Sequence, residues 1–217
     1  MTAFLIVLAV AAEAYLLGSV DTGILVSKYL YHDDVRTHGS GAAGMTNMLR
    51  TFGKKAAAMT ATGDVLKGVL AVCIGRWLFQ LLPADAGVSP YLGVYLAAIF
   101  AVLGHLYPLY FGFKGGKGIL SGGTLVWLLD WRVGLIAWGL FAALWLLTRY
   151  VSLGSVCAAA SMPVTTFFFC GRSLLYTALA VLIAALVIWC HRENITRLLH
   201  HQERKFQWHT GTPEEKE

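Results

Sequence analysis

The chain has 217 residues, of which 57% are hydrophobic and 13% are charged, and its formal net charge is +5 at pH 7. A charged fraction this far below the roughly 25% of ordinary domains excludes a soluble globular protein and indicates a polytopic membrane protein. The first residues lack the basic start and small-residue cleavage site of a removable signal peptide, so we expect the first apolar run to remain as a helix. Without zinc-finger or helix-turn-helix spacing, the positive charge predicts no nucleic-acid partner.

Apolar runs follow one another through the chain, and each is a candidate membrane-spanning helix. They cover residues 2–27, 56–82, 91–112, 119–129, 133–148, 155–170 and 174–190. A span usually needs about 20 residues, because the bilayer core is about 30 Å thick. The run 119–129 is therefore expected to tilt, to thin the bilayer or to be re-entrant. The sequence predicts an all-α integral membrane protein of about seven transmembrane helices, some of them short or re-entrant.

Basic residues are unevenly shared between the two sets of connections. One set carries Lys28, Arg36, Arg50, Lys54, Lys55, Lys114, Lys117, Arg149, Arg192, Arg197, Arg204, Lys205 and Lys216. The other set carries Arg132 and Arg172, with Arg76 near a helix end. By the positive-inside rule, we expect the first set to face the cytoplasm, with the N-terminus outside and the C-terminus inside.

No repeat or linker divides the chain. We expect a single transmembrane domain over residues 1–208 and a polar C-terminal tail over residues 209–217. The four cysteines stand singly in apolar runs, without metal-ligand spacing or a pairing pattern, so they are interpreted as helix-packing residues. The sequence predicts no metal site and no cofactor.

The stretch "GSGAAGMTN", residues 39–47, has the glycine spacing of a nucleotide-binding loop. Gly39, Gly41 and Gly44 fit G-x-G-x-x-G, and Asp64 stands at about the offset of 20 residues where a ribose-binding acid is expected. A dinucleotide site also needs a preceding buried strand, whereas this stretch follows the charged segment "YHDDVRTH" and a membrane helix. The Rossmann interpretation is therefore rejected.

A second glycine-rich stretch, "GFKGGKGI", resembles a Walker A loop but lacks its spacing and its magnesium-binding Ser or Thr. Both stretches suit oxyanion binding, because glycines let backbone N–H groups converge on a phosphate. Ser40 and Thr46 add hydroxyl donors, and Arg50, Lys114 and Lys117 add positive charge. The alternative is that the glycines mark tight turns and the basic residues anchor to lipid headgroups.

Together, several blocks carry a resemblance that no single glycine pattern would. These are "GSGAAGMTNMLRTFG", "GDVLKG", "GHLYPLYFGFKGGKGI", "RYVSLGS" and "HRENITRLLHHQERKF". In this order the chain resembles the PlsY family, the bacterial acyl-phosphate:glycerol-3-phosphate acyltransferases, from "GSVDTGILVSK" nearly to residue 206. The resemblance implies an integral membrane enzyme with seven helices, an external N-terminus and a cytoplasm-facing active site in the bacterial cytoplasmic membrane.

The implied reaction moves an acyl chain from acyl phosphate to the 1-hydroxyl of glycerol 3-phosphate, giving lysophosphatidic acid and phosphate. The implied partners are these two substrates, membrane lipid and the soluble enzyme that makes acyl phosphate. The residues implied in catalysis are Ser40, Arg50, Lys117, Ser155, His191 and Asn194. Those implied in binding substrate phosphate are Gly39, Gly41, Gly44, Thr46, Asn47, Lys114 and Ser152. The chain departs from the family at Ala42, usually Asn, and at Asp21, usually Pro.

An acyl phosphate is already activated, so we expect direct transfer without a covalent acyl-enzyme. The alternative is a Ser40 nucleophile activated by His191. A rival function is a small anion transporter using Glu13 and Asp21, although no repeated halves are present.

Two further features are predicted inside the spans. Asp64 and Lys67 lie one helical turn apart, which predicts an ion pair. His105 is interpreted as an interfacial histidine that is satisfied by a helix carbonyl, with a proton-accepting role as the alternative.

Overall fold

The computed structural model describes residues 2–83 and 87–206, and over these residues the chain forms helices and no strands. The helices are α1 (Thr2–Ser19), α2 (Thr22–Leu30), α3 (Met45–Gln80), α4 (Pro90–Leu106), α5 (Ile119–Leu129), α6 (Trp131–Thr148), α7 (Val151–Phe169), α8 (Leu174–Cys190) and α9 (Arg192–Leu199). Two short 3-10 turns, Val35–Thr37 and Leu109–Phe111, stand in the connections. The predicted tail 209–217 lies outside the described residues.

The helix lengths confirm the all-α polytopic membrane fold. In the described part of the chain, five segments are long and apolar enough to cross a bilayer: Ala3–Leu30, Met45–Gln80, Pro90–Phe111, Trp131–Thr148 and Val151–Phe169. Helices α8 and α9 make a sixth if their 61° bend is counted within one span. The short run appears as α5, whose 11 residues are too few to cross a bilayer of ordinary thickness.

The first predicted run is divided in the structure. Helix α1 ends at Ser19, and α2 begins after Asp21, whose carboxylate accepts a hydrogen bond from the backbone N–H of Ile24 at 3.2 Å. A side-chain acceptor at this position satisfies an N–H group that a new helix leaves unpaired, so Asp21 favours a helix start there. Hydropathy alone could not show this break.

Helix α3 begins earlier than the apolar pattern predicts. It starts at Met45 rather than near residue 56, so Thr46, Asn47 and Arg50 stand on its first turns and not in a loop. Its path is bent at Gly53, where φ is 83°, a conformation that glycine adopts without steric penalty. The polar first turns therefore project beyond the apolar part of α3.

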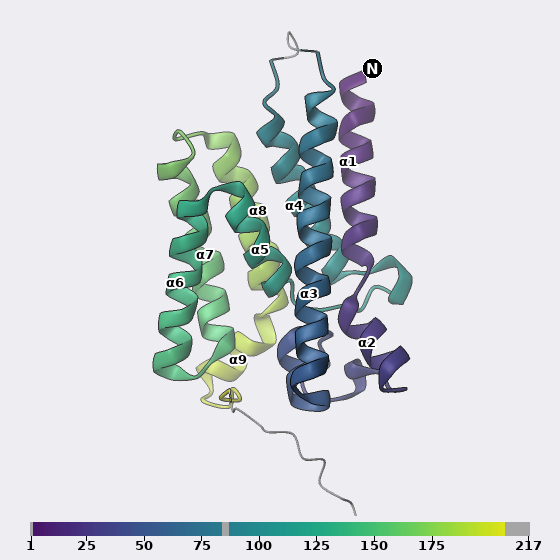
Figure 1. The fold of residues 1–217 in the computed structure, drawn as a ribbon. Helices are drawn as coiled ribbons and strands as arrows, with labels where there is room; N and C mark the ends of the chain where they lie inside the picture. The colour runs from purple at the N-terminus through teal and green to yellow at the C-terminus, as the bar shows by residue number, and fades with distance from the viewer. Residues whose placement is uncertain (1, 84–86, 207–217) are drawn as a thin grey trace, which may run out of the picture.

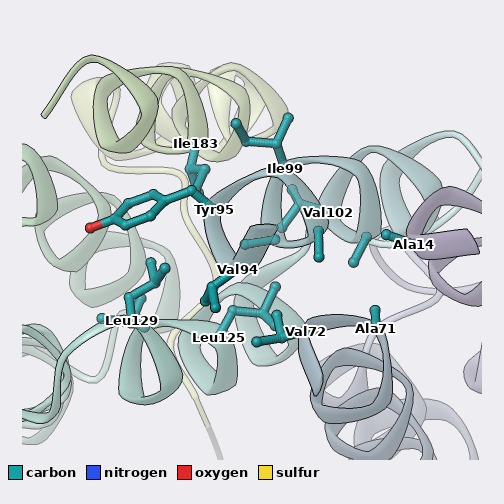
Figure 2. Packing of buried hydrophobic residues seen from close by; sticks show 14 of the residues in the cluster. Ala14, Ala71, Val72, Val94, Tyr95, Ile99, Val102, Leu125, Leu129 and Ile183 are labelled. Carbon is teal, nitrogen blue, oxygen red and sulfur yellow. The ribbon is translucent and has the colours of Figure 1, made fainter. Parts of the chain in front are cut away.

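Figure 1 shows α1, α3 and α4 side by side on one side of the bundle and α6 and α7 on the other, with α5 and α8 between them. Figure 2 shows the shared core, in which Val94 and Tyr95 of α4 lie among Val72 of α3, Leu125 of α5 and Ile183 of α8. Helix α4 is therefore the centre of the fold.

Close approach of α1 and α4 depends on two glycines. A Cβ at Gly104 would overlap the carbonyl oxygen of Tyr15, and one at Gly18 would overlap that of Ala101. Small residues at such contacts are the usual means by which membrane helices pack tightly. The start of α1 and the end of α3 lie at one end of the bundle, and α2 and α9 lie at the other (Figure 1).

Candidate active site

A polar cavity of about 940 Å³, including its open mouth, lies between the first turns of α3, the segment before α5, helices α6 and α7, and residues 191–203. It brings together ten of the predicted site residues: Ser40, Gly44, Thr46, Asn47, Arg50, Lys117, Ser152, Ser155, His191 and Asn194. Gly39, Gly41 and Lys114 do not line it, and the Lys114 side chain is exposed. Four blocks that are distant in sequence thus meet in one place.

The first glycine-rich loop is held in shape by Asn47, which is buried. Its Oδ1 accepts a hydrogen bond from the backbone N–H of Ser40 at 3.1 Å. Its two Nδ2–H donors are shared among the carbonyl oxygens of Val35 (3.1 Å), His38 (3.0 Å) and Ala42 (3.0 Å). These contacts use the amide to order the loop at the cavity wall.

Glycine is required where the loop turns. Gly39 and Gly41 have φ of 58° and 69°, values that a residue with a side chain rarely adopts. A Cβ at Gly39 would also overlap Asn47 Oδ1. These two glycines therefore shape the backbone from outside the cavity, while Ser40 and Gly44 reach its wall.

The start of α3 supplies backbone N–H donors beside the first glycine-rich loop. Gly44 is the N-cap residue and has no side chain, so no capping oxygen competes for the first backbone N–H groups of the helix. Free N–H groups and the helix dipole favour an anion at such an end. Arg50, an exposed residue that lines the cavity, adds a positive charge about one and a half turns along the helix. This combination suits a phosphate.

The second glycine-rich loop contributes Lys117. Its ammonium donates a hydrogen bond to Asn194 Oδ1 at 2.5 Å, across the cavity to α9. Burial lowers the pKa of Lys117 below its ordinary value, and the positive charge of Arg197 lowers it further. The lysine is thus held at a defined position by the opposite wall.

Glu203 is a cavity residue that the sequence analysis missed. Its carboxylate accepts hydrogen bonds from Ser152 Oγ (2.8 Å), Asn194 Nδ2 (2.7 Å) and Arg197 Nε (2.8 Å). Burial acts to raise the pKa of this carboxyl, but the hydrogen bonds from Arg197, Asn194 and Ser152 outweigh it, and the pKa lies below its ordinary value. Its position in the block "HHQERKF" was the available signal.

His191 and Ser155 each have a bond to their own helix. His191 Nδ1 lies 2.8 Å from the carbonyl oxygen of Val187, so this nitrogen carries the proton and donates, which leaves Nε2 as the acceptor. Ser155 Oγ donates to the carbonyl oxygen of Val151 at 2.8 Å. Within the described residues, no hydrogen bond joins His191 to Ser40.

An apolar groove of about 560 Å³, including its opening, continues from the polar cavity. Side chains of α5, α6, α7 and α8 line it, almost all of them apolar. Five residues line both spaces: Gly118, Ile119, Trp138, Phe141 and Ser155. The site can therefore hold a ligand with an anionic head and a long apolar chain.

The predicted Asp64–Lys67 ion pair is confirmed, with 3.0 Å between Asp64 Oδ1 and Lys67 Nζ. The expectation for His105 is wrong, because its Nδ1 lies 2.8 Å from Lys67 Nζ instead of bonding a helix carbonyl. Helix packing brings the ring to the lysine, which sequence spacing does not reveal. Among the described residues, no three His, Cys, Asp or Glu side chains are arranged to hold a metal ion.

The chain is similar to known proteins over nearly its full length. A family model described as Glycerol-3-phosphate acyltransferase matches residues 7–201. A glycerol-3-phosphate acyltransferase of Prochlorococcus marinus (strain MIT 9215) is 40% identical over 195 residues, which cover 88% of this chain and 93% of that protein. One from Clostridioides difficile (strain 630) is 42% identical over 196 residues, which cover 90% and 93%.

Two crystal structures have the same fold. Both are of PlsY (YgiH), an integral membrane glycerol 3-phosphate acyltransferase. The glycerol 3-phosphate form has 35% identity and a TM-score of 0.81, and the lysophosphatidic acid form has 34% and 0.77. Each match covers 93% of this chain and 96% of the other. These likenesses argue against the transporter alternative, and the chain belongs to the glycerol-3-phosphate acyltransferase family.

Proposed function

We propose that the protein transfers an acyl chain from acyl phosphate to the 1-hydroxyl of glycerol 3-phosphate, giving lysophosphatidic acid and inorganic phosphate as the first step of phospholipid synthesis. The observation that carries the proposal is the continuity of the cationic polar cavity with the apolar groove. Glycerol 3-phosphate is small and anionic, whereas an acyl phosphate joins an anionic head to a long apolar chain. One cavity with both kinds of wall suits both substrates.

In this proposal the phosphates occupy the polar cavity and the acyl chain occupies the groove. Arg50 and the first N–H groups of α3 bind one phosphate, and Lys117 binds the other. Ser40, Thr46 and His191 line the same cavity and offer further polar contacts. Phe141 and Trp138, which line both spaces, flank the junction where the acyl carbonyl would lie.

We assign a direct transfer. The 1-hydroxyl oxygen of glycerol 3-phosphate attacks the acyl carbon, the bond between that carbon and the phosphate oxygen breaks, and phosphate leaves. The hydroxyl proton passes to a phosphate oxygen, so the reaction needs no other base. Positive charge from Arg50 and Lys117 stabilises the charge that develops on the phosphates. Ser40 has no hydrogen bond to His191 in the described structure, which gives no support to an activated serine.

Detergent-purified protein supplied with palmitoyl phosphate tests the reaction and its mechanism. We expect phosphate release only when glycerol 3-phosphate is present, together with formation of lysophosphatidic acid. Without glycerol 3-phosphate, mass spectrometry of the quenched protein should find no acyl adduct. A stoichiometric adduct on Ser40, absent from Ser40→Ala, would replace direct transfer by a two-step mechanism. No phosphate release with both substrates would refute the proposed donor.

We further propose that the cavity faces the cytoplasm of a bacterial cytoplasmic membrane. Lys54 and Lys55 stand near the start of α3, and Arg149 stands between α6 and α7. These helix ends lie at the cavity end of the bundle, and the start of α1 lies at the other end (Figure 1). The positive-inside rule places the basic end in the cytoplasm.

Thiol labelling in intact cells tests this orientation. In a variant without the native cysteines, we expect Val88→Cys, in the α3–α4 connection, to react with an impermeant maleimide. Lys55→Cys, exposed at the opposite end of α3, should react only after lysis. The reverse pattern would place the cavity outside the cell.

A further inference from the structure

Three ionisable side chains meet at the inner wall of the polar cavity, and the proposed chemistry does not use them. Lys67 of α3 is buried, as are Asp64 of the same helix and His105 of α4. The Lys67 ammonium lies 3.0 Å from Asp64 Oδ1 and 2.8 Å from His105 Nδ1. It also donates a hydrogen bond to the carbonyl oxygen of Val20 at 2.8 Å.

The contacts fix the state of the histidine ring. An ammonium group has three donors and no acceptor, so Nδ1 of His105 must accept, and the neutral ring carries its proton on Nε2. Each ammonium proton thus has an acceptor nearby. Buried ionic groups are expensive in a membrane protein, and apolar residues would hold two helices together at least as well. Their presence therefore calls for a role beyond helix packing.

One branch of this cluster reaches the first glycine-rich loop. Val20 lies in the break between α1 and α2, so its bond to Lys67 ties the start of α2 to α3. Helix α2 in turn touches the loop, because a Cβ at Gly23 would overlap the carbonyl oxygen of Ala43. The position of residues 39–44 thus depends on where α2 is held.

The other branch reaches the second glycine-rich loop. The backbone N–H of Gly116 donates to the carbonyl oxygen of His105 at 3.1 Å. A Cβ at Gly116 would overlap Nε2 of the His105 ring, so the loop lies directly against the imidazole. The next residue is Lys117, which binds Asn194 across the cavity. The position of the His105 ring therefore determines where the Lys117 side chain lies in the cavity.

We propose that Lys67, supported by Asp64 and His105, is the positioning residue that holds the two glycine-rich loops at the separation required by the two substrates. Lys67 does not itself line the cavity, whereas Asp64 and His105 do, so it acts through its neighbours. The inference rests on the proposed function for its substrates, but it concerns the geometry of the site and not the identity of the acyl donor.

Lys67→Met tests the proposal, because it removes the ammonium and keeps a long side chain. We expect a loss of about tenfold to a hundredfold in kcat/KM for glycerol 3-phosphate per folded molecule, the range for a small misplacement of reacting groups. A residue that only stabilises the fold would lower the yield and Tm but leave kcat/KM per folded molecule unchanged. Lys55→Met, which removes an exposed lysine of the same helix, should leave kcat/KM per folded molecule and Tm unchanged.

A pair of His105 variants separates the hydrogen bond from the packing. His105→Leu removes the acceptor for Lys67 and should behave like Lys67→Met. His105→Asn retains an oxygen near the position of Nδ1 and should recover most of the lost kcat/KM. Gly116→Ala, which pushes the loop away from the ring without changing any charge, should lower kcat/KM as well.

Calorimetry of glycerol 3-phosphate binding to the same proteins distinguishes a failure of the positioning role from a failure of the proposed acyl donor. We expect Lys67→Met, His105→Leu and Gly116→Ala each to weaken binding at least tenfold, and His105→Asn to weaken it less. If these folded variants bind and turn over like the parent protein, the positioning role is wrong. If Lys67→Met does not fold, the His105 pair and Gly116→Ala decide. A parent that binds glycerol 3-phosphate but is inactive with palmitoyl phosphate would refute the donor and not the positioning role.

Discussion

The two walls of the cavity are ordered by different chemistry. On the α3 wall, the neutral amide of Asn47 contacts four backbone polar groups of residues 35–42, with its two N–H donors shared among three carbonyl oxygens. On the α7–α9 wall, the carboxylate of Glu203 accepts hydrogen bonds from Ser152, Asn194 and Arg197. The first arrangement fixes a loop, and the second fixes side chains.

The difference has consequences for how each wall responds to conditions. An amide does not titrate, so the first wall should hold its shape over a wide pH range. A carboxylate changes charge, and its hydrogen bonds are stronger when it is ionised. Lys117 connects the walls, because it leaves the second glycine-rich loop and binds Asn194, which Glu203 holds. The cavity thus joins a pH-insensitive half to a pH-sensitive half.

The largest effects should come from removing the cation that each half supplies. Arg50→Ala and Lys117→Ala should each lose on the order of 2–4 kcal/mol of transition-state stabilisation, the range for one preorganised donor. Both variants should insert and fold, because neither residue is part of the apolar core. Steady-state kcat/KM on purified protein measures the loss. If both variants keep full activity, the basic residues are headgroup anchors and the phosphate assignment is wrong.

Asn47→Ala should have the next largest effect, on the amide-ordered wall. It leaves the Ser40 N–H and three carbonyl groups without this partner, and an unpaired buried polar group costs about 1–3 kcal/mol. We expect a lower Tm together with a lower kcat/KM. Because the amide does not titrate, the fall in Tm should be the same at every pH, which thermal unfolding in detergent over a pH series can check.

Glu203→Gln should have a smaller, pH-dependent effect, on the carboxylate-ordered wall. Its pKa is lowered in the folded protein, so the charged carboxylate stabilises the fold above the ordinary glutamate pKa, and this contribution is lost as the pH falls through the lowered value. We expect the variant to be less stable than the parent by about 1 kcal/mol at neutral pH.

The same series of unfolding experiments tests the direction in which the stability difference changes with pH. As the pH falls below the ordinary range of a glutamate, the parent should lose stability and the two proteins should converge. A stability difference that stays constant with pH would show that Glu203 acts by shape alone, and the contrast between the walls would then disappear. Asn47→Ala, measured beside it, provides the pH-independent comparison.

The sequence predicted those parts of the structure that are encoded locally. Apolar runs marked the helices, and the short run 119–129 became α5 with the same bounds. The two glycine-rich blocks, together with "RYVSLGS" and "HRENITRLLHHQERKF", contained ten residues that line the cavity. Such patterns are readable because each depends on neighbours within a few turns of helix.

Contacts between segments that are distant in the chain could not be predicted from the sequence. The bond between Lys67 and His105 joins two helices, and that between Ser152 and Glu203 spans 51 positions. The start of α3 was missed because its first turns are polar and have no apolar period, although they are helical. Asp21 as a helix cap was missed because a long apolar run continues on both sides of it.

The smallest effect is expected for Lys114→Ala, which tests how local the cationic site is. Lys114 stands three residues before Lys117 in the same loop, but its side chain is exposed and does not line the cavity. Its carbonyl oxygen accepts a hydrogen bond from Arg36 at 3.1 Å, and alanine keeps that backbone contact. A surface change of this kind is usually within about 0.5 kcal/mol, so kcat/KM should stay within about twofold of the parent.

Any residual effect should be a long-range attraction for anionic substrates, which appears as a higher KM at low ionic strength and vanishes near 0.15 M salt, where the Debye length is about 8 Å. Kinetics of Lys114→Ala and Lys117→Ala at two salt concentrations make the comparison. If both variants lose activity equally at both salt concentrations, the whole loop binds phosphate. The contact with Asn194 would then not distinguish Lys117 from Lys114.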